Sequence, residues 1–106
     1  METNDTPSPA PASLQQLRAR VSGRVQGVGF RYYALSQAES LGLTGWVRNR
    51  PDGSVEVLAE GSRPELEAFV DALWKGPSGA SVRNVHVEWS PASGTFERFQ
   101  VTFFGF

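Results

Sequence analysis

A chain of 106 residues, 40% of them hydrophobic, is long enough for one domain with a single core. Its formal net charge of −1 leaves no excess of positive charge for non-specific binding to nucleic acid or to an anionic membrane. The chain has no cysteine, which excludes disulfides, thiolate catalysis, zinc fingers and iron–sulfur clusters. We therefore expect a single-domain protein, cytoplasmic by default, with no nucleic-acid or membrane partner.

The first residues are rich in proline and in small or polar side chains. Pro7, Pro9 and Pro11 lie in a segment with no apolar run and no basic start, which predicts neither a signal peptide nor a membrane span. A segment of this composition buries too little apolar surface to offset the entropy of ordering it. We predict a flexible Pro-rich tail over residues 1–16 and a folded domain over residues 17–106.

An alternating pattern follows and predicts a strand with one buried face. Apolar or small residues occupy Leu17, Ala19, Val21, Gly23 and Val25, and the positions between them hold Arg18, Arg20, Ser22 and Arg24. Helical spacing then appears at Phe30, Ala34, Gln37 with Ala38, and Leu41. Gly42 follows as a C-terminal stop, so we predict a helix of about three turns.

The middle of the chain predicts a hairpin and a second helix. Residues 43–49 alternate, Pro51-Asp52-Gly53 is a turn signature, and a second alternating run over Val55, Val57 and Ala59 ends at Gly61. Ser62-Arg63-Pro64-Glu65 predicts a capping box. Apolar residues follow at Leu66, Phe69, Val70 and Leu73, and Lys75-Gly76-Pro77 ends the predicted helix.

Two more strands are predicted near the C-terminus. Apolar residues alternate at Val85, Val87 and Trp89 and again at Phe99, Val101 and Phe103, with a loop over residues 90–95. The predicted order is β-α-β-β-α-β plus a C-terminal strand. Two strand–helix–strand units in this order predict an α+β, ferredoxin-like two-layer sandwich, in which an antiparallel sheet carries two helices on one face.

The stretch from Val21 to Arg31 contains the first candidate site. Gly27 and Gly29 allow a tight turn and a close approach to a ligand, and the N–H groups that open a helix carry partial positive charge without intrahelical partners. A glycine loop between strand and helix is most often plain turn chemistry. Arg31, a fixed cation with a planar fork of donors in the first helical turn, favours an anion site instead, and phosphate suits it best.

Asn49 is the second candidate, at the end of the predicted strand that contains Gly45-Trp46-Val47-Arg48-Asn49. In a split β-α-β layout this strand end can return beside residues 26–31, where the carboxamide could orient a water molecule. An asparagine that serves only the turn at Pro51-Asp52-Gly53 is as good an explanation of the spacing. The sequence leaves both roles open.

Other polar and aromatic residues have simpler interpretations. His86, the single histidine, has no nearby cysteine or acidic cluster that would make a metal site, and the serines have no histidine partner, so a nucleophilic triad would lack its base. Glu56, Glu60, Glu65 and Glu67 are predicted to lie on solvated faces, and Trp46, Trp74 and Trp89 to pack in the core or at its rim. Arg18, Arg20 and Arg24 are expected to add positive field near the loop. No metal site is predicted.

Two blocks of the sequence resemble the signature blocks of the acylphosphatases. The first is Gly23-Arg24-Val25-Gln26-Gly27-Val28-Gly29-Phe30-Arg31, and the second is Gly45-Trp46-Val47-Arg48-Asn49, followed by Asp52-Gly53 and Gly61. The resemblance covers about residues 17–103 and has no departure at the motif positions. The Pro-rich start and the closing Gly105-Phe106 lie outside the usual core.

The resemblance implies hydrolysis of a carboxyl–phosphate mixed anhydride without a metal or a cofactor. It implies that the phosphoryl group is bound by the Arg31 side chain and by the backbone amides of Gln26, Gly27, Val28, Gly29, Phe30 and Arg31. It implies that Asn49 positions the attacking water. The chemistry agrees, because phosphoryl transfer needs mainly positioning and charge stabilisation, and the leaving carboxylate has a low pKa (~4), so no general acid is required. We expect a monomer that acts on a small-molecule acyl phosphate.

Two alternatives stay open at this point. One is a non-catalytic ferredoxin-like binding module for RNA or a small anion, although an RNA module would need exposed aromatics on central strands and net positive charge. The other is a detached relative of the acylphosphatase-like domain in larger carbamoyl-transferring maturation proteins, whose accompanying zinc-binding segments this sequence lacks. The sequence does not name the physiological acyl phosphate.

Overall fold

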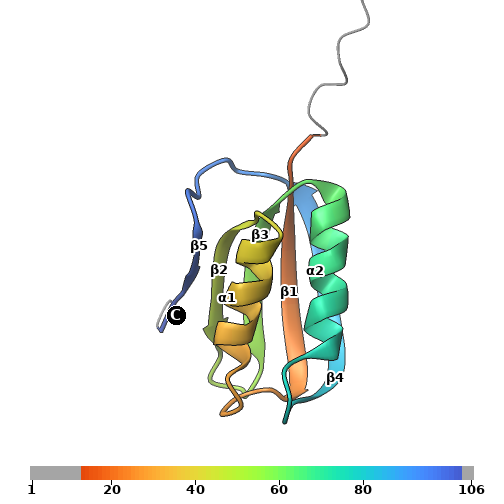
Figure 1. The fold of residues 1–106 in the computed structure, drawn as a ribbon, viewed down its shortest axis with the longest axis vertical. Helices are drawn as coiled ribbons and strands as arrows, with labels where there is room; N and C mark the ends of the chain where they lie inside the picture. The colour runs from red at the N-terminus through yellow and green to blue at the C-terminus, as the bar shows by residue number, and fades with distance from the viewer. Residues whose placement is uncertain (1–12, 104–106) are drawn as a thin grey trace, which may run out of the picture.

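The computed structural model describes residues 13–103, so most of the predicted tail and the last three residues lie outside the described part. Within it, two helices cover one face of a five-stranded sheet (Figure 1). The elements are β1 (Gln15–Arg24), α1 (Phe30–Ser40), β2 (Thr44–Asn49), β3 (Val55–Gly61), α2 (Arg63–Lys75), β4 (Ser81–Pro91) and β5 (Phe99–Val101). The predicted α+β, ferredoxin-like sandwich is confirmed.

The strand order in the sheet is β4-β1-β3-β2-β5. β1 pairs antiparallel with β3 and β4, and β2 pairs antiparallel with β3. β1 and β2 therefore run in the same direction and finish at the same end of the sheet. The sequence leaves the pairing of the last strand undecided, and the structure pairs β5 parallel with β2, so the sheet is mixed. The reason is the connection after β4, which crosses the end of the sheet where β2 begins and so gives β5 the direction of β2 (Figure 1).

Some element ends differ from the predicted ones. Gln15 and Gln16, assigned by the sequence pattern to the tail, belong to β1, where they pair with Gly61 and Glu60 of β3. β5 ends at Val101, so Phe103 lies beyond the strand. Ser62 is the N-cap of α2, but its side chain makes no capping hydrogen bond, so the predicted capping box does not form. Its carbonyl accepts the first helical hydrogen bond from the Leu66 amide, at 3.0 Å.

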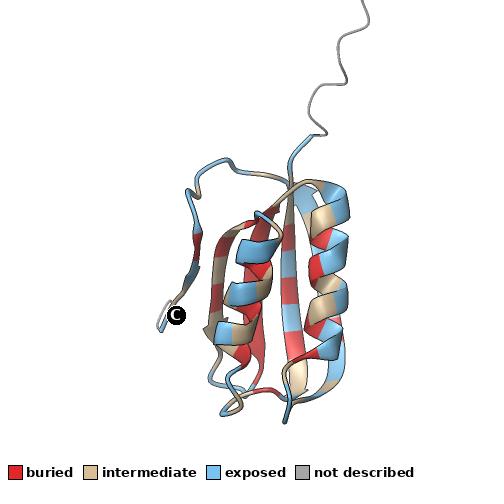
Figure 2. Ribbon diagram, viewed as in Figure 1, coloured by how far each residue is buried: buried red, intermediate tan, exposed pale blue. Residues whose placement is uncertain are grey.

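The core lies between the helices and the inner face of the sheet, as the alternating patterns predict (Figure 2). The fully buried positions of β1, β3 and the helices are Leu17, Ala19, Val21, Val55, Val57, Ala59, Ala34, Ala38, Leu66, Phe69 and Leu73. Phe30, the first residue of α1, is 2% exposed. Burying a side chain of this size stabilises the fold by about 1.5–3 kcal/mol, and here it also anchors the start of α1 against the sheet.

Glu60 lies on the other face of the sheet and is buried, so the prediction that it is solvated is wrong. Its carboxylate accepts hydrogen bonds from the Gln16 side chain (2.7 Å) and from the Ser93 amide (2.7 Å) and hydroxyl (2.8 Å). The Gly94 amide donates a further bond, at 3.0 Å. Burial opposes the charged form, but these donors outweigh it and lower the pKa of Glu60. Glu60 thus fastens the connection that leads to β5.

Candidate active site

The loop between β1 and α1 has the backbone geometry that its two glycines predict. Gly27 and Gly29 both have φ of 76°, a left-handed conformation that side chains other than glycine rarely adopt. A Cβ atom built at either glycine would meet no atom within 4 Å, so the loop backbone is open to the surroundings. The loop therefore lies accessible at the end of the sheet where β1 finishes. It contains the predicted residues Gln26, Gly27, Val28 and Gly29.

The N-terminus of α1 faces the same loop without a side chain to cap it. Gly29 is its N-cap, and the first turn contains no acidic residue. The amide of Tyr33 bonds to the carbonyl of Gly29 at 3.0 Å, which closes the first helical turn. Residues 30–32 precede that bond, and amides in this position of a helix have no intrahelical acceptor and carry partial positive charge. This helix start can therefore accept an anion.

Gln26 holds the loop to the turn between β2 and β3. Its side-chain amide donates to the carbonyls of Arg50 and Ser54, each at 2.8 Å. From the sequence, Gln26 is expected to contribute only its backbone amide to the phosphate site. Nothing in the sequence indicates this side-chain role. The two hydrogen bonds connect the end of β2 to the loop after β1, as the split β-α-β layout predicts.

Arg31 extends from the first turn of α1 and is half-buried. Its guanidinium carbon lies 4.8 Å from the centroid of the Phe103 ring. Within residues 13–103, no carboxylate forms an ion pair with it. Arg31 therefore brings a cation whose hydrogen-bond donors are unused by the described part of the protein.

Asn49 is the last residue of β2 and is half-buried beside Val55 of β3. The turn that follows is stabilised by Asp52, whose carboxylate accepts hydrogen bonds from the Ser54 amide (2.9 Å) and hydroxyl (2.6 Å). These bonds lower the pKa of Asp52. Among the described residues, the Asn49 carboxamide takes no part in the turn. The explanation that Asn49 serves only this turn therefore loses its basis.

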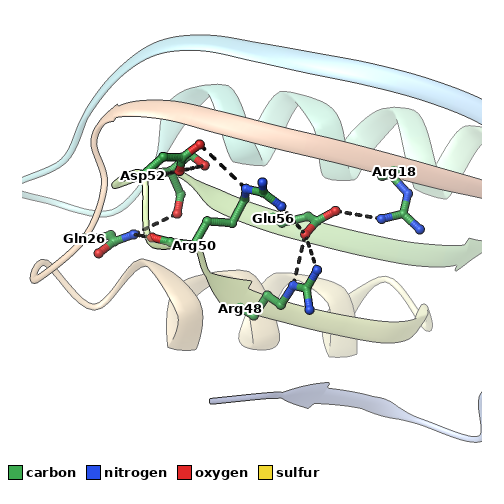
Figure 3. A network of polar contacts seen from close by, with 7 residues as sticks. Arg18, Gln26, Arg48, Arg50, Asp52 and Glu56 are labelled. Atoms are coloured by element: carbon green, nitrogen blue, oxygen red, sulfur yellow. Dashed lines mark hydrogen bonds and ion pairs between the residues drawn. The ribbon is translucent and has the colours of Figure 1, made fainter. Parts of the chain in front are cut away.

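Glu56 occupies the middle of the outer sheet face and binds three arginines, so the prediction that it is solvated is wrong (Figure 3). Its Oε1 accepts from Arg48 Nη2 at 2.8 Å and from Arg50 Nη1 at 3.1 Å, and its Oε2 from Arg18 Nη1 at 2.6 Å. Burial opposes the charged carboxylate, but the arginines outweigh it, and the pKa of Glu56 is lowered. Arg18, expected to add positive field near the loop, forms an ion pair with Glu56, which it shares with Arg48 and Arg50.

The remaining candidates lie away from the loop. His86 is exposed and faces Glu88 at 3.5 Å, and residues 13–103 contain no cluster of metal-ligating side chains. A hollow of about 510 Å³ lies at the opposite end of the sheet and is lined by Leu14, Leu43 and Phe96 among others. No helix in the described range has the length and apolar character needed to cross a membrane. The loop after β1 is the best candidate site.

The fold and this loop define a class of small α+β domain in which a glycine loop, an uncapped helix and an arginine meet at one end of the sheet. The family model described as Acylphosphatase matches residues 17–101. An acylphosphatase of Pelotomaculum thermopropionicum is 51% identical over 83 residues, which are 78% of this chain and 90% of the relative. One of Salinibacter ruber is 48% identical over 87 residues, 82% and 92% of the two chains. The chain belongs to the acylphosphatase family of enzymes.

A solved structure agrees with this assignment. The crystal structure of acylphosphatase from Bacillus subtilis matches with a TM-score of 0.81 at 43% identity, covering 83% of this chain and 98% of that one. The family assignment favours an enzyme over the non-catalytic binding module considered as the alternative.

Replacing Glu56 by glutamine tests the arginine cluster. At neutral pH we expect Glu56→Gln to lower the free energy of unfolding by about 1–3 kcal/mol, because buried donors of Arg48 and Arg50 lose a charged acceptor. Urea denaturation measures this difference. Glu88→Gln is the matched control on the same face; its side chain is 67% exposed, and we expect a change of less than about 0.5 kcal/mol.

The difference in stability between the parent protein and Glu56→Gln should also depend on pH in a predictable direction. Because the pKa of Glu56 is lowered from its ordinary value of 4.5, its contribution to stability is complete above that value. It is lost as the pH falls through the lower pKa of the folded state. The stabilities of the parent protein and Glu56→Gln should therefore converge in acid, and a constant gap from about pH 7 to about pH 3 would contradict the assignment.

Proposed function

We propose that this protein hydrolyses the carboxyl–phosphate bond of small acyl phosphates, with the phosphoryl group bound at the β1–α1 loop. The observation that supports the proposal is the uncapped start of α1 at residues 30–32, with Arg31 in its first turn and no ion-pair partner for Arg31 within residues 13–103. Asn49 ends β2, whose following turn is hydrogen-bonded to the same loop through Gln26. Together they provide donors for a phosphoryl group and a polar group for a water molecule.

In this proposal, Arg31 and the backbone amides of residues 26–31 hold the phosphoryl oxygens. They stabilise the charge that develops on those oxygens as the water attacks phosphorus. The Asn49 carboxamide orients that water. The bond between phosphorus and the acyl oxygen breaks, and the carboxylate leaves with the bonding electron pair. The water oxygen stays on phosphorus, and its proton passes to the phosphate product or to solvent.

The leaving group explains why a site of this composition is sufficient. A carboxylate has a pKa of ~4, so it departs without protonation, whereas an alkoxide from a phosphomonoester would need a general acid. One chain supplies every proposed site residue, so we expect a monomer that acts on a small molecule and not on nucleic acid. The acyl part of the substrate is left open by the proposal.

The direct test is the hydrolysis of benzoyl phosphate in the presence of excess EDTA, with a phosphomonoester as the matched control substrate. We expect rapid release of phosphate from the acyl phosphate and little from the monoester, because only the first has a leaving group that needs no proton. Loss of activity in EDTA with recovery on adding a divalent ion would contradict the proposed mechanism.

Substitutions of Arg31 and Asn49 should have different kinetic effects. Arg31→Ala should weaken both substrate binding and inhibition by inorganic phosphate, and Arg31→Lys should restore little, because an ammonium lacks the planar fork. Asn49→Ala should lower kcat by about 10²–10³ while phosphate inhibition persists, since it removes one preorganised polar group.

Controls separate these effects from damage to the fold. Arg98→Ala removes an exposed arginine directly before β5, and Asn84→Ala an exposed asparagine of β4, and both should keep the parental kinetics. Each variant must also unfold in urea like the parent protein. A folded Asn49→Ala protein with the parental kcat would show that Asn49 does not position the water.

A further inference from the structure

An aromatic residue from the end of the chain contacts the arginine of the proposed site. The Phe103 ring lies 4.8 Å from the guanidinium carbon of Arg31. The Phe103 side chain is 63% exposed, so burial of apolar surface does not account for its position. The contact with Arg31 gives this residue a candidate role.

The register of β5 explains how Phe103 reaches the site. β5 runs parallel to β2, with Gly45 opposite Phe99 and Val47 opposite Val101. The Thr102 amide continues the pairing by donating to the carbonyl of Val47 at 2.9 Å. Phe103 follows two residues after Val101, beyond the end of β5. The short last strand therefore places the Phe103 ring at the end of the sheet where both proposed site residues lie.

Stacking restrains a guanidinium without consuming its hydrogen bonds. The group is planar and its N–H donors point outward in the plane, so a ring against its face leaves those donors available. A free arginine side chain loses part of its rotamer entropy when it binds phosphate. A ring that already restricts Arg31 reduces the entropy lost on binding.

Other arginines in the described part of the protein lie over aromatic rings and use their donors in this way, among them Arg48 and Arg63. Arg48 stacks on Trp46 with its guanidinium carbon 4.8 Å from the ring centroid, and it donates to Glu56. Arg63 stacks on Trp89 at 3.6 Å and donates to Glu67 and Gln15. Arg31 has the stacked ring but, within the described range, no acceptor for its donors. In the proposed function, the substrate phosphoryl group accepts hydrogen bonds from these donors.

We propose that Phe103 is a positioning residue, which holds Arg31 by its face so that the in-plane donors are ready for the phosphoryl group. The inference rests on the proposed role of Arg31 as the phosphate-binding side chain. It extends the functional site to the segment after β5, which the motif blocks do not include. Phe103 itself needs no contact with the reacting atoms.

Substitution of Phe103 in the full chain tests this role through phosphate affinity. We expect Phe103→Leu to raise KM for benzoyl phosphate and the inhibition constant of inorganic phosphate together, by about two- to five-fold, with little change in kcat. Phe103→Tyr and Phe103→Trp keep an aromatic face and should retain the parental values. Trp74→Leu, which removes an exposed aromatic residue of α2, is the matched control and should change neither constant.

A double variant makes the test specific to Arg31. If the ring acts through Arg31, Phe103→Leu should have no further effect on phosphate affinity in an Arg31→Ala background. Parental phosphate inhibition in Phe103→Leu would overturn the inference. A raised KM for benzoyl phosphate with unchanged phosphate inhibition would also overturn it, because the ring would then contact the acyl group instead.

These outcomes can be told apart from a failure of the proposed function. If Arg31→Ala binds inorganic phosphate as the parent does, the phosphate-binding role of Arg31 fails and the inference about Phe103 fails with it. If Arg31→Ala loses phosphate affinity but Phe103→Leu does not, only the inference about Phe103 fails. Because Phe103 is exposed, the Phe103 variants should unfold in urea at the parental midpoint.

Discussion

The two hydrogen bonds from the Gln26 side chain to the carbonyls of Arg50 and Ser54 connect the two halves of the candidate site. They can form because β1 and β2 both pair antiparallel with β3 and therefore finish at the same end of the sheet. The first half contains the glycine loop, the start of α1 and Arg31. The second contains Asn49 and the turn stabilised by Asp52. The Gln26 hydrogen bonds thus hold the loop after β1 directly against the turn after β2.

The distribution of charge around the site follows from where carboxylates are buried. Glu56 accepts hydrogen bonds from Arg18, Arg48 and Arg50 on the outer face of the sheet (Figure 3). Arg31 lies at the start of α1 and has no such carboxylate among the described residues. The arginines of the sheet thus stabilise the fold. The arginine of the helix has its donors available for a ligand, as the proposed function requires.

The sequence predicted the elements because apolar residues on their core-facing sides repeat with the period of a strand or a helix, although β3 is buried on both faces. It predicted the tight turn at Gly27 and Gly29 and the place of Arg31 in the first turn of a helix, because these features depend on neighbours within a few residues. It missed the environments of Glu56 and Glu60, which depend on register between strands far apart in the chain.

The parallel direction of β5, which the sequence leaves undecided, depends on the same kind of distant pairing. The connection from β4 to β5 is long enough for either direction, so local patterns do not decide it. The contact of Phe103 with Arg31 depends on that direction and could not be predicted from spacing.

A titration with inorganic phosphate, followed by the backbone amide resonances in NMR, tests the location of the phosphate site most directly. We expect the largest shifts at the amides of residues 26–31, with small shifts near Glu60 at the opposite end of the sheet. Arg31→Ala should weaken the titration without moving it elsewhere. Largest shifts around Arg20 and His86 on the outer face, with the loop amides unmoved, would contradict a phosphate site at the start of α1.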